Sequence, residues 1–195
     1  MRRAAGLAVI VLLSCLLLQS QQTPKVEVFG GYALAIVDDR APVVFPQRFL
    51  HNGWTGAVNF NLDQHVGLVA DFGGYYGTHD PFGSLQIPSR LHTFMFGPQV
   101  SEQFKSFAPF GHFLVGAATV TDKFHFTAIA PFVIPPSPLI SANGFAFAFG
   151  GGVDTRISDL VAWRVQADYL NTSLFKQKWD NARFATGVVF RFGSR

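Results

Sequence analysis

The chain has 195 residues, of which 49% are hydrophobic and 14% are charged, and 22 of them are phenylalanine. This balance excludes a disordered or nucleic-acid-binding chain, since such chains have few aromatic residues and a high net charge. The single cysteine excludes an intrachain disulfide and a cysteine-based zinc motif, and 19 glycines with 11 prolines disfavour a long-helix protein.

The N-terminal segment has the pattern of a secretory signal peptide. A basic start, Met1-Arg2-Arg3, precedes the apolar run Ala4–Leu18 and a polar exit, and we expect cleavage near Ser20. The apolar run is too short for a spanning helix, which needs about 20 apolar residues. Residues 1–20 are therefore predicted to be a signal peptide, and residues 21–195 the mature domain.

The cysteine of this segment allows two interpretations. Leu12-Leu13-Ser14-Cys15 loosely resembles a lipobox, which would make Cys15 a lipid-bearing N-terminus. The apolar run continues through Leu16–Leu18, which favours an ordinary signal-peptide cysteine. Removing the segment takes away two arginines and leaves 13 basic side chains against 12 acidic ones, so no excess of positive charge supports nucleic-acid binding.

The mature chain alternates large apolar residues with small or polar ones, which is the period of a β-strand. In the last segment, Phe184 and Phe190 fall on one face and Arg183 and Arg191 on the other. The same reading predicts eight strands, at residues 25–35, 54–62, 66–76, 91–100, 107–118, 144–153, 161–169 and 182–192.

The connections between these strands differ in length in a regular way. Long connections follow the odd-numbered strands, at residues 36–53, 77–90, 119–142 and 170–180. Short ones follow the even-numbered strands, at residues 63–65, 101–106 and 154–159. A meander with long loops at one end and tight turns at the other is typical of a bacterial outer-membrane barrel. The predicted fold class is all-β, an eight-stranded antiparallel up-and-down transmembrane β-barrel filling residues 21–195.

The chain resembles the eight-stranded OmpA-like outer-membrane β-barrel family. The segments that carry the resemblance are Val26–Tyr32, Gly150–Arg156, Gln166–Tyr169 and Gly187–Gly193. The resemblance implies a bacterial outer-membrane location, contact with outer-membrane lipids and lipopolysaccharide, assembly by periplasmic chaperones and the barrel-insertion machinery, and a monomer. The peptidoglycan-binding domain of longer family members is not expected, and Phe192, the aromatic residue of the last strand, stands three residues from the end.

Polar residues on the faces opposite the phenylalanines are predicted to point into the barrel. Besides Lys25, these are Glu27, Asn59, Asn61, Asp71, Arg164, Gln166, Asp168, Arg183 and Arg191. An eight-stranded barrel is filled by its side chains or holds one small ligand. The polar set is therefore either a hydrogen-bonded plug or, as the resemblance allows, a gated low-conductance path. Because the first and last strands close the barrel, Glu27 is expected near Arg191.

Enzymatic barrels are the competing class. None of the six histidines stands in the His-x-Ser motif of the lipid A deacylases. Asp38-Asp39 and His79-Asp80, in predicted long loops, are similar to the pairs of outer-membrane aspartyl proteases, but those proteases resemble a ten-stranded barrel, and loop aspartates are usually turn formers. We expect no catalytic residues, no cofactor and no metal site.

Two further features bear on function. The Pro-rich segment Thr127–Ile140 is either a self-packed loop or a contact surface for a partner or for lipid acyl chains. A soluble lipocalin-like binder would need its apolar faces inside, and the phenylalanines would then fill its cavity. The sequence predicts an outer-membrane barrel with a structural or surface-interaction role, or alternatively a narrow gated porin, with phenylalanines facing lipid and Trp and Tyr forming the girdle.

Overall fold

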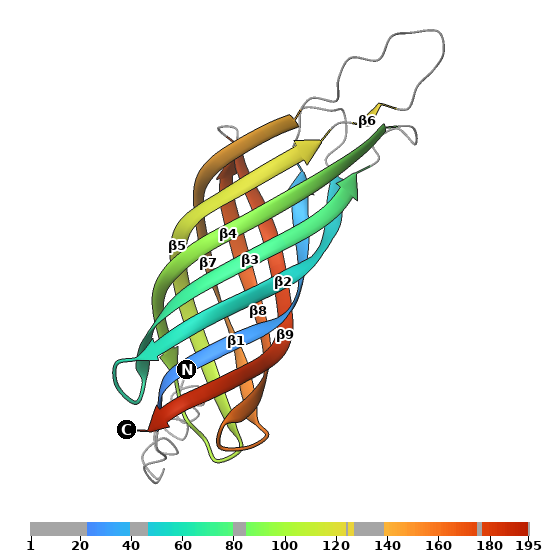
Figure 1. Cartoon of the computed structure of the whole chain (residues 1–195). Coiled ribbons are helices and arrows are strands. Elements are labelled where there is room, and N and C mark those ends of the chain that lie inside the picture. Colours follow the sequence, from blue (N-terminus) through green and yellow to red (C-terminus); the bar gives the residue numbers. More distant parts are fainter. Residues whose placement is uncertain are drawn as a thin grey trace, which may run out of the picture.

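The computed structural model describes residues 23–39, 47–79, 85–123, 125–126, 139–174 and 177–194. They form a closed barrel of eight long strands and one two-residue strand, β6 (Figure 1). The strands are β1 (Pro24–Asp39), β2 (Gln47–Asn61), β3 (Val66–His79), β4 (Leu85–Ser101), β5 (Phe107–Lys123), β6 (His125–Phe126), β7 (Leu139–Arg156), β8 (Val161–Leu174) and β9 (Gln177–Ser194). The predicted signal peptide, Cys15 and residues 127–138 of the Pro-rich segment lie outside the described residues.

Strand pairing confirms the predicted up-and-down topology. Each long strand pairs antiparallel with the next long strand along the chain, and β1 pairs with β9 to close the barrel. The strand β6 pairs only with the beginning of β4. Within the described residues, no helix is long and apolar enough to cross a membrane.

The two faces of the strands are those that the sequence predicts. In β9, Phe184 and Phe190 are exposed on the outside, whereas Arg183 and Arg191 are buried inside. Large apolar side chains elsewhere on the outside are also half exposed, for example Phe96 at 58%. An apolar exterior around a polar interior is the arrangement of a barrel surrounded by lipid.

Not every aromatic residue follows the expected pattern. Phe29 and Phe110 lie inside the barrel, as their strand positions predict. The expectation that Trp and Tyr form an outer girdle is wrong for Tyr75 and Trp179, whose side chains are buried inside. Tyr75 is in phase with Asp71 on β3, and alternation therefore turns it inward whatever its preference for an interface.

The strands are longer than predicted, and this corrects the expected loops. They contain 14 to 18 residues, against about 9–11 for a tilted membrane span. The loop predicted at 170–180 is mostly strand, because β8 and β9 remain paired as far as Leu174 and Gln177. Asp38 and Asp39 lie in β1, and His79 ends β3, so these residues are not in loops; Asp80 lies outside the described residues. Backbone hydrogen bonds between strands continue beyond the apolar band. The side chains there no longer alternate between apolar and polar, so the sequence does not reveal these parts of the strands.

The short turns are confirmed at one end of the barrel, here called the turn end. The strand bounds leave residues 62–65, 102–106 and 157–160 as connections there. Asp63 stabilises the first turn, since its Oδ1 accepts hydrogen bonds from the backbone N–H groups of His65 and Val66 at 2.7 and 2.8 Å. The turn predicted at 154–159 begins later, because β7 continues to Arg156.

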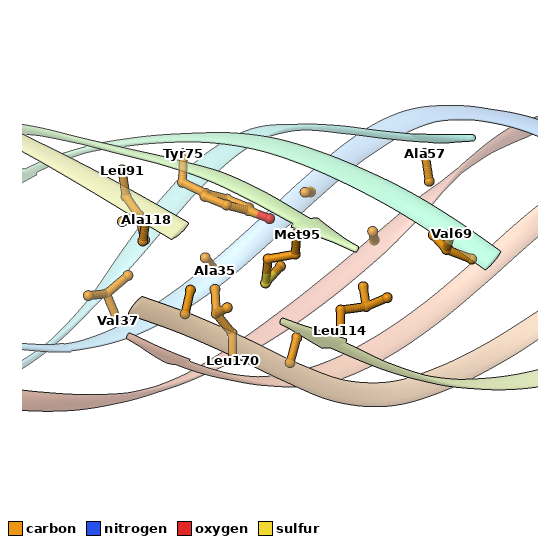
Figure 2. Close-up of a cluster of buried hydrophobic side chains, with 14 of the residues drawn as sticks. Ala35, Val37, Ala57, Val69, Tyr75, Leu91, Met95, Leu114, Ala118 and Leu170 are labelled. Atoms are coloured by element: carbon orange, nitrogen blue, oxygen red, sulfur yellow. The ribbon is translucent and has the colours of Figure 1, made fainter. Parts of the chain in front are cut away.

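The interior is divided along the barrel axis. Towards the end opposite the turns it is mainly apolar, and Leu91 and Leu170 are no more than 2% exposed (Figure 2). Val37 near the end of β1 and Val120 near the end of β5 belong to the same region. The charged side chains lie in the remaining part, from mid-barrel to the turn end.

Candidate functional site

All the polar residues proposed for the interior lie inside the barrel except Lys25. They are at most 6% exposed: Glu27, Asn59, Asn61, Asp71, Arg164, Gln166, Asp168, Arg183 and Arg191. The placement expected for Lys25 is wrong. Its side chain is exposed because it stands at the mouth of the turn end, where a lysine reaches water more easily than a buried partner.

Arg183 is the centre of the mid-barrel cluster and is fully buried. Its Nε donates to Asp168 Oδ2 and its Nη1 to Asp71 Oδ1, both at 2.7 Å. The same Nη1 lies 3.2 Å from the hydroxyl of Tyr75. Asp168 stands directly opposite Arg183 in the β8–β9 ladder. Asp71 lies on β3, which is separated from β9 by the strands β2 and β1. One guanidinium thus compensates two buried carboxylates.

Asp168 has further partners inside the barrel. His112 Nε2 lies 2.8 Å from Asp168 Oδ1, and the Gln166 amide donates to Asp168 Oδ2 at 3.1 Å. His112 and Asp168 come from β5 and β8, and both pair with Gly150 of the intervening strand β7. A Cβ atom at Gly150 would lie 2.4 Å from Asp168 Oδ1. The glycine therefore leaves the space in which the imidazole and the carboxylate meet.

A second cluster lies nearer the turn end. Arg164 donates from Nε and Nη2 to the two oxygens of Asp154 at 2.7 and 2.8 Å, a bidentate pair across the β7–β8 ladder. The Arg164 guanidinium also lies between two aromatic rings, 5.0 Å from the centroid of Phe29 and 4.2 Å from that of Phe110. These inward phenylalanines are therefore cation–π partners of a buried charge.

Glu27 and Arg191 are brought together by barrel closure. They stand opposite each other in the β1–β9 ladder, with Arg191 Nε 3.3 Å from Glu27 Oε1. Arg191 Nη2 also lies 3.7 Å from Asp154 Oδ2, so this guanidinium stands between two carboxylates. The Asn59 amide donates to Glu27 Oε2 at 3.1 Å.

The asparagines extend the network to the mouth. Asn59 Nδ2 lies 2.8 Å from Asn61 Oδ1, and the Asn61 amide donates to the backbone carbonyl of Pro24 at 2.8 Å. Among the described buried residues, the acidic members are Glu27, Asp71, Asp154 and Asp168, and the arginines are Arg164, Arg183 and Arg191. Every one of these charges lies within 4 Å of an opposite charge.

Three residues that take part in these interior clusters were missing from the sequence-based set. Asp154 was assigned to a turn, although its even number on β7 is in phase with Ala146 and Ala148, which also point inward. His112 shares the inward face of β5, and only the phase of a weakly patterned strand indicated it. Tyr75 was assigned to the outside. Extending the alternation of the predicted strand 144–153 by one residue would have found Asp154, whereas the alternation within 66–76 and 107–118 already places Tyr75 and His112 inward.

The arrangement limits the chemistry of the interior. Among the described residues, no group of three His, Cys, Asp or Glu side chains could hold a metal ion. The His112–Asp168 pair is buried, with side-chain exposures of 3% and 0%, and its carboxylate is bound by Arg183. The network neutralises and fills the interior among the described residues.

Comparison with known proteins gives relatives by fold. No family model matches the chain, and no curated protein matches it. Ail, the attachment invasion locus protein of Yersinia pestis, solved in complex with the heparin analogue sucrose octasulfate, aligns over 86% of this chain and 99% of its own with 15% identity and a TM-score of 0.59. Neisserial surface protein A aligns over 89% of this chain and 100% of its own with 10% identity and a TM-score of 0.57. The resemblance to the OmpA-like family is confirmed at the level of the fold: the chain is an eight-stranded β-barrel of the outer-membrane type.

Proposed function

We propose that this protein is an integral β-barrel of the bacterial outer membrane with a structural or surface-interaction role. The observation that carries the proposal is the inverted distribution of side chains, with exposed Phe96, Phe145 and Val165 outside and ion-paired arginines inside. In water such an exterior would aggregate, whereas in lipid it lowers the free energy of the folded barrel. Surface interaction is compatible with this fold, since the attachment protein Ail has it.

Two barriers support a closed interior. The first is the network of ion pairs that extends from Glu27 near the turn end to Arg183 at mid-barrel, in which each charge has a partner of opposite sign. The second is the apolar region around Leu91 and Leu170 towards the opposite end. Opening an ion pair would leave the apolar barrier in place, and an apolar constriction resists wetting. The polar residues therefore serve as a structural plug in this proposal.

The proposal assigns no enzymatic activity, no cofactor and no metal to the barrel. Its support is the burial of the His112–Asp168 pair, whose carboxylate is already bound by Arg183. A monomer is supported by barrel closure, because β1 and β9 pair with each other and leave no edge strand for a second copy. Residues 1–20 act as the signal peptide, and residues 21–195 are inserted by the barrel-assembly machinery.

Membrane fractionation tests the proposal. We expect the protein in the outer-membrane fraction, with a mature mass that corresponds to loss of residues 1–20. On a detergent gel an unboiled sample should migrate as a compact band that shifts on boiling, as closed barrels do. Recovery in the soluble fraction without detergent would reject an outer-membrane barrel and favour a soluble binder.

A gated low-conductance pore is the second candidate. It is favoured by the position of Arg191, which stands between Glu27 and Asp154 at 3.3 and 3.7 Å and so has an alternative partner. Planar-bilayer recordings separate the two candidates. The plug predicts no channel openings in the wild type or in Glu27→Ala, because the apolar barrier remains. Openings that appear or lengthen in Glu27→Ala would establish the pore.

A further inference from the structure

The outer face of the β3–β4 ladder changes from apolar to polar along its length. From the turn end upwards, the directly opposed outward pairs are Leu68–Pro98, Ala70–Phe96, Phe72–Phe94, Gly74–His92 and Tyr76–Arg90. The change occurs between Phe94 and His92, within one pair of strands. A surface that is apolar below and polar above matches an amphiphile lying along it.

The apolar part is an aromatic surface. The rings of Phe72 and Phe94 have centroids 5.0 Å apart and are 41% and 49% exposed. Phe96 lies one outward position nearer the turn end and is exposed as well. This part of the ladder faces the hydrocarbon of the membrane and offers contact to acyl chains.

The polar part is ordered by a chain of hydrogen bonds. The Trp54 indole Nε1 lies 3.4 Å from the Tyr76 hydroxyl, and that hydroxyl lies 3.3 Å from His92 Nε2. Because an indole N–H can only donate, the Tyr76 oxygen accepts from Trp54, and the direction of the Tyr76–His92 hydrogen bond is set by the tautomer of His92. The other ring nitrogen of His92, Nδ1, is not used in this chain of hydrogen bonds.

A glycine allows this chain to form. A Cβ atom at Gly74 would lie 2.7 Å from Trp54 Nε1, so the indole lies directly over the Gly74 backbone. From there it reaches the Tyr76 hydroxyl. The rings of Tyr76 and His92 meet edge to face, with centroids 5.7 Å apart. The position of the His92 side chain on β4 is thus fixed by its contacts with Tyr76 on the neighbouring strand β3.

Arg90 adds a positive charge beside His92. It is exposed, and it stands directly opposite Tyr76 in the ladder. Among the residues that the structure describes, no acidic side chain forms an ion pair with Arg90. Within the part of the chain that the structure describes, the Arg90 guanidinium and the His92 imidazole therefore both offer polar nitrogens on the outward face above the aromatic surface. This set is complementary to a phosphate group.

We propose that the outer β3–β4 face, formed by Trp54, Phe72, Tyr76, Arg90, His92 and Phe94, binds the phosphorylated glucosamine head group of lipid A. Arg90 and His92 contact the phosphate, and acyl chains lie on Phe72 and Phe94. The end opposite the turns faces the outer leaflet in this class of barrel, and lipid A is the phosphorylated amphiphile of that leaflet. This inference rests on the proposed outer-membrane location.

Native mass spectrometry of the purified protein in detergent tests the site. The probes are bisphosphorylated lipid A, the same lipid A without its phosphates, and phosphatidylglycerol. In the variant Arg90→Gln/His92→Gln we expect roughly tenfold weaker binding of bisphosphorylated lipid A, since charge-assisted contacts are lost. Dephosphorylated lipid A should bind the wild type and the variant equally weakly.

Two matched variants serve as controls. Thr119→Ala/Asn143→Ala removes an outward hydrogen-bonded pair from β5 and β7 that pairs in register with His92 but carries no charge. Lys105→Gln removes an exposed cation at the turn end. Both should bind lipid A like the wild type, and all variants should keep the compact unboiled band. Unchanged lipid A binding by Arg90→Gln/His92→Gln would overturn the site, as would phosphatidylglycerol binding that matches lipid A. Recovery of the protein outside the outer membrane would instead contradict the proposed location, whatever the binding in detergent.

Discussion

Replacement of Arg183 by methionine tests the interior network most directly. The substitution keeps a long apolar side chain and removes the hydrogen bonds to Asp71, Asp168 and Tyr75. Asp168 retains its contacts with His112 and Gln166, so the main uncompensated charge is that of Asp71, which is 1% exposed. Breaking a buried ion pair by removing one partner costs about 3–5 kcal/mol, and we expect Arg183→Met to lower the free energy of unfolding by that amount.

A second substitution separates the charge from the lost packing. Asp71→Asn in the Arg183→Met background removes the uncompensated carboxylate, so we expect it to restore about 2 kcal/mol even though it adds a mutation. The assay is equilibrium denaturation of the barrel in lipid vesicles, followed by tryptophan fluorescence and by the unboiled gel band. Arg90→Met, which removes an exposed arginine, should change stability by less than about 0.5 kcal/mol.

Either of two results would contradict an uncompensated charge on Asp71 in Arg183→Met. One is an Arg183→Met variant within about 1 kcal/mol of the wild type, which would mean that water already compensates Asp71. The other is further destabilisation by Asp71→Asn in that background, which would mean that the carboxylate has a favourable partner other than Arg183.

Three further predictions concern other parts of the barrel. Gly31→Ala should destabilise the barrel by about 1–3 kcal/mol in the same denaturation assay, because the new Cβ would lie 2.3 Å from a backbone oxygen of β9. The adjacent Gly30→Ala, whose Cβ would have nothing within 4 Å, should leave stability unchanged. Equal effects of the two substitutions would contradict the packing argument. Phe29→Ala should cost about 3–5 kcal/mol, as it opens a cavity and removes one ring from Arg164, and Phe29→Leu should cost clearly less. Deleting residues 129–138 should leave the heat-modifiable band intact, since β5 and β7 pair without them. If the Pro-rich segment is a contact surface rather than a self-packed loop, the deletion should also abolish surface adhesion, and unchanged adhesion would exclude that role.

The ion pairs between neighbouring strands are close to what the sequence allows one to derive. Asp154 and Arg164 flank a short turn and stand opposite each other in the ladder, so hairpin register leads from one to the other. Glu27 and Arg191 follow from the closure of the first and last strands. In both cases the two partners lie on strands that are neighbours in any up-and-down barrel, so the strand order alone brings them together.

Strand ends and cross-barrel contacts do not follow from such rules. Outside the apolar band the outward residues are polar as well, and the alternation that predicts β8 disappears before the strand ends at Leu174. His112 and Asp168 meet only because Gly150 between them has no side chain. No property of the segments around His112 or Asp168 taken separately indicates this contact.

The 22 phenylalanines, the few charges and the strand period by themselves determined that the chain forms a barrel with an apolar exterior and arginines inside. That much follows from local chemistry, because alternate residues of a strand meet different surroundings. Only the tertiary structure decided that Arg183 compensates Asp71, a residue 112 positions away. The physical reason is the narrow interior of an eight-stranded barrel, whose curvature brings side chains from non-adjacent strands into contact across the axis.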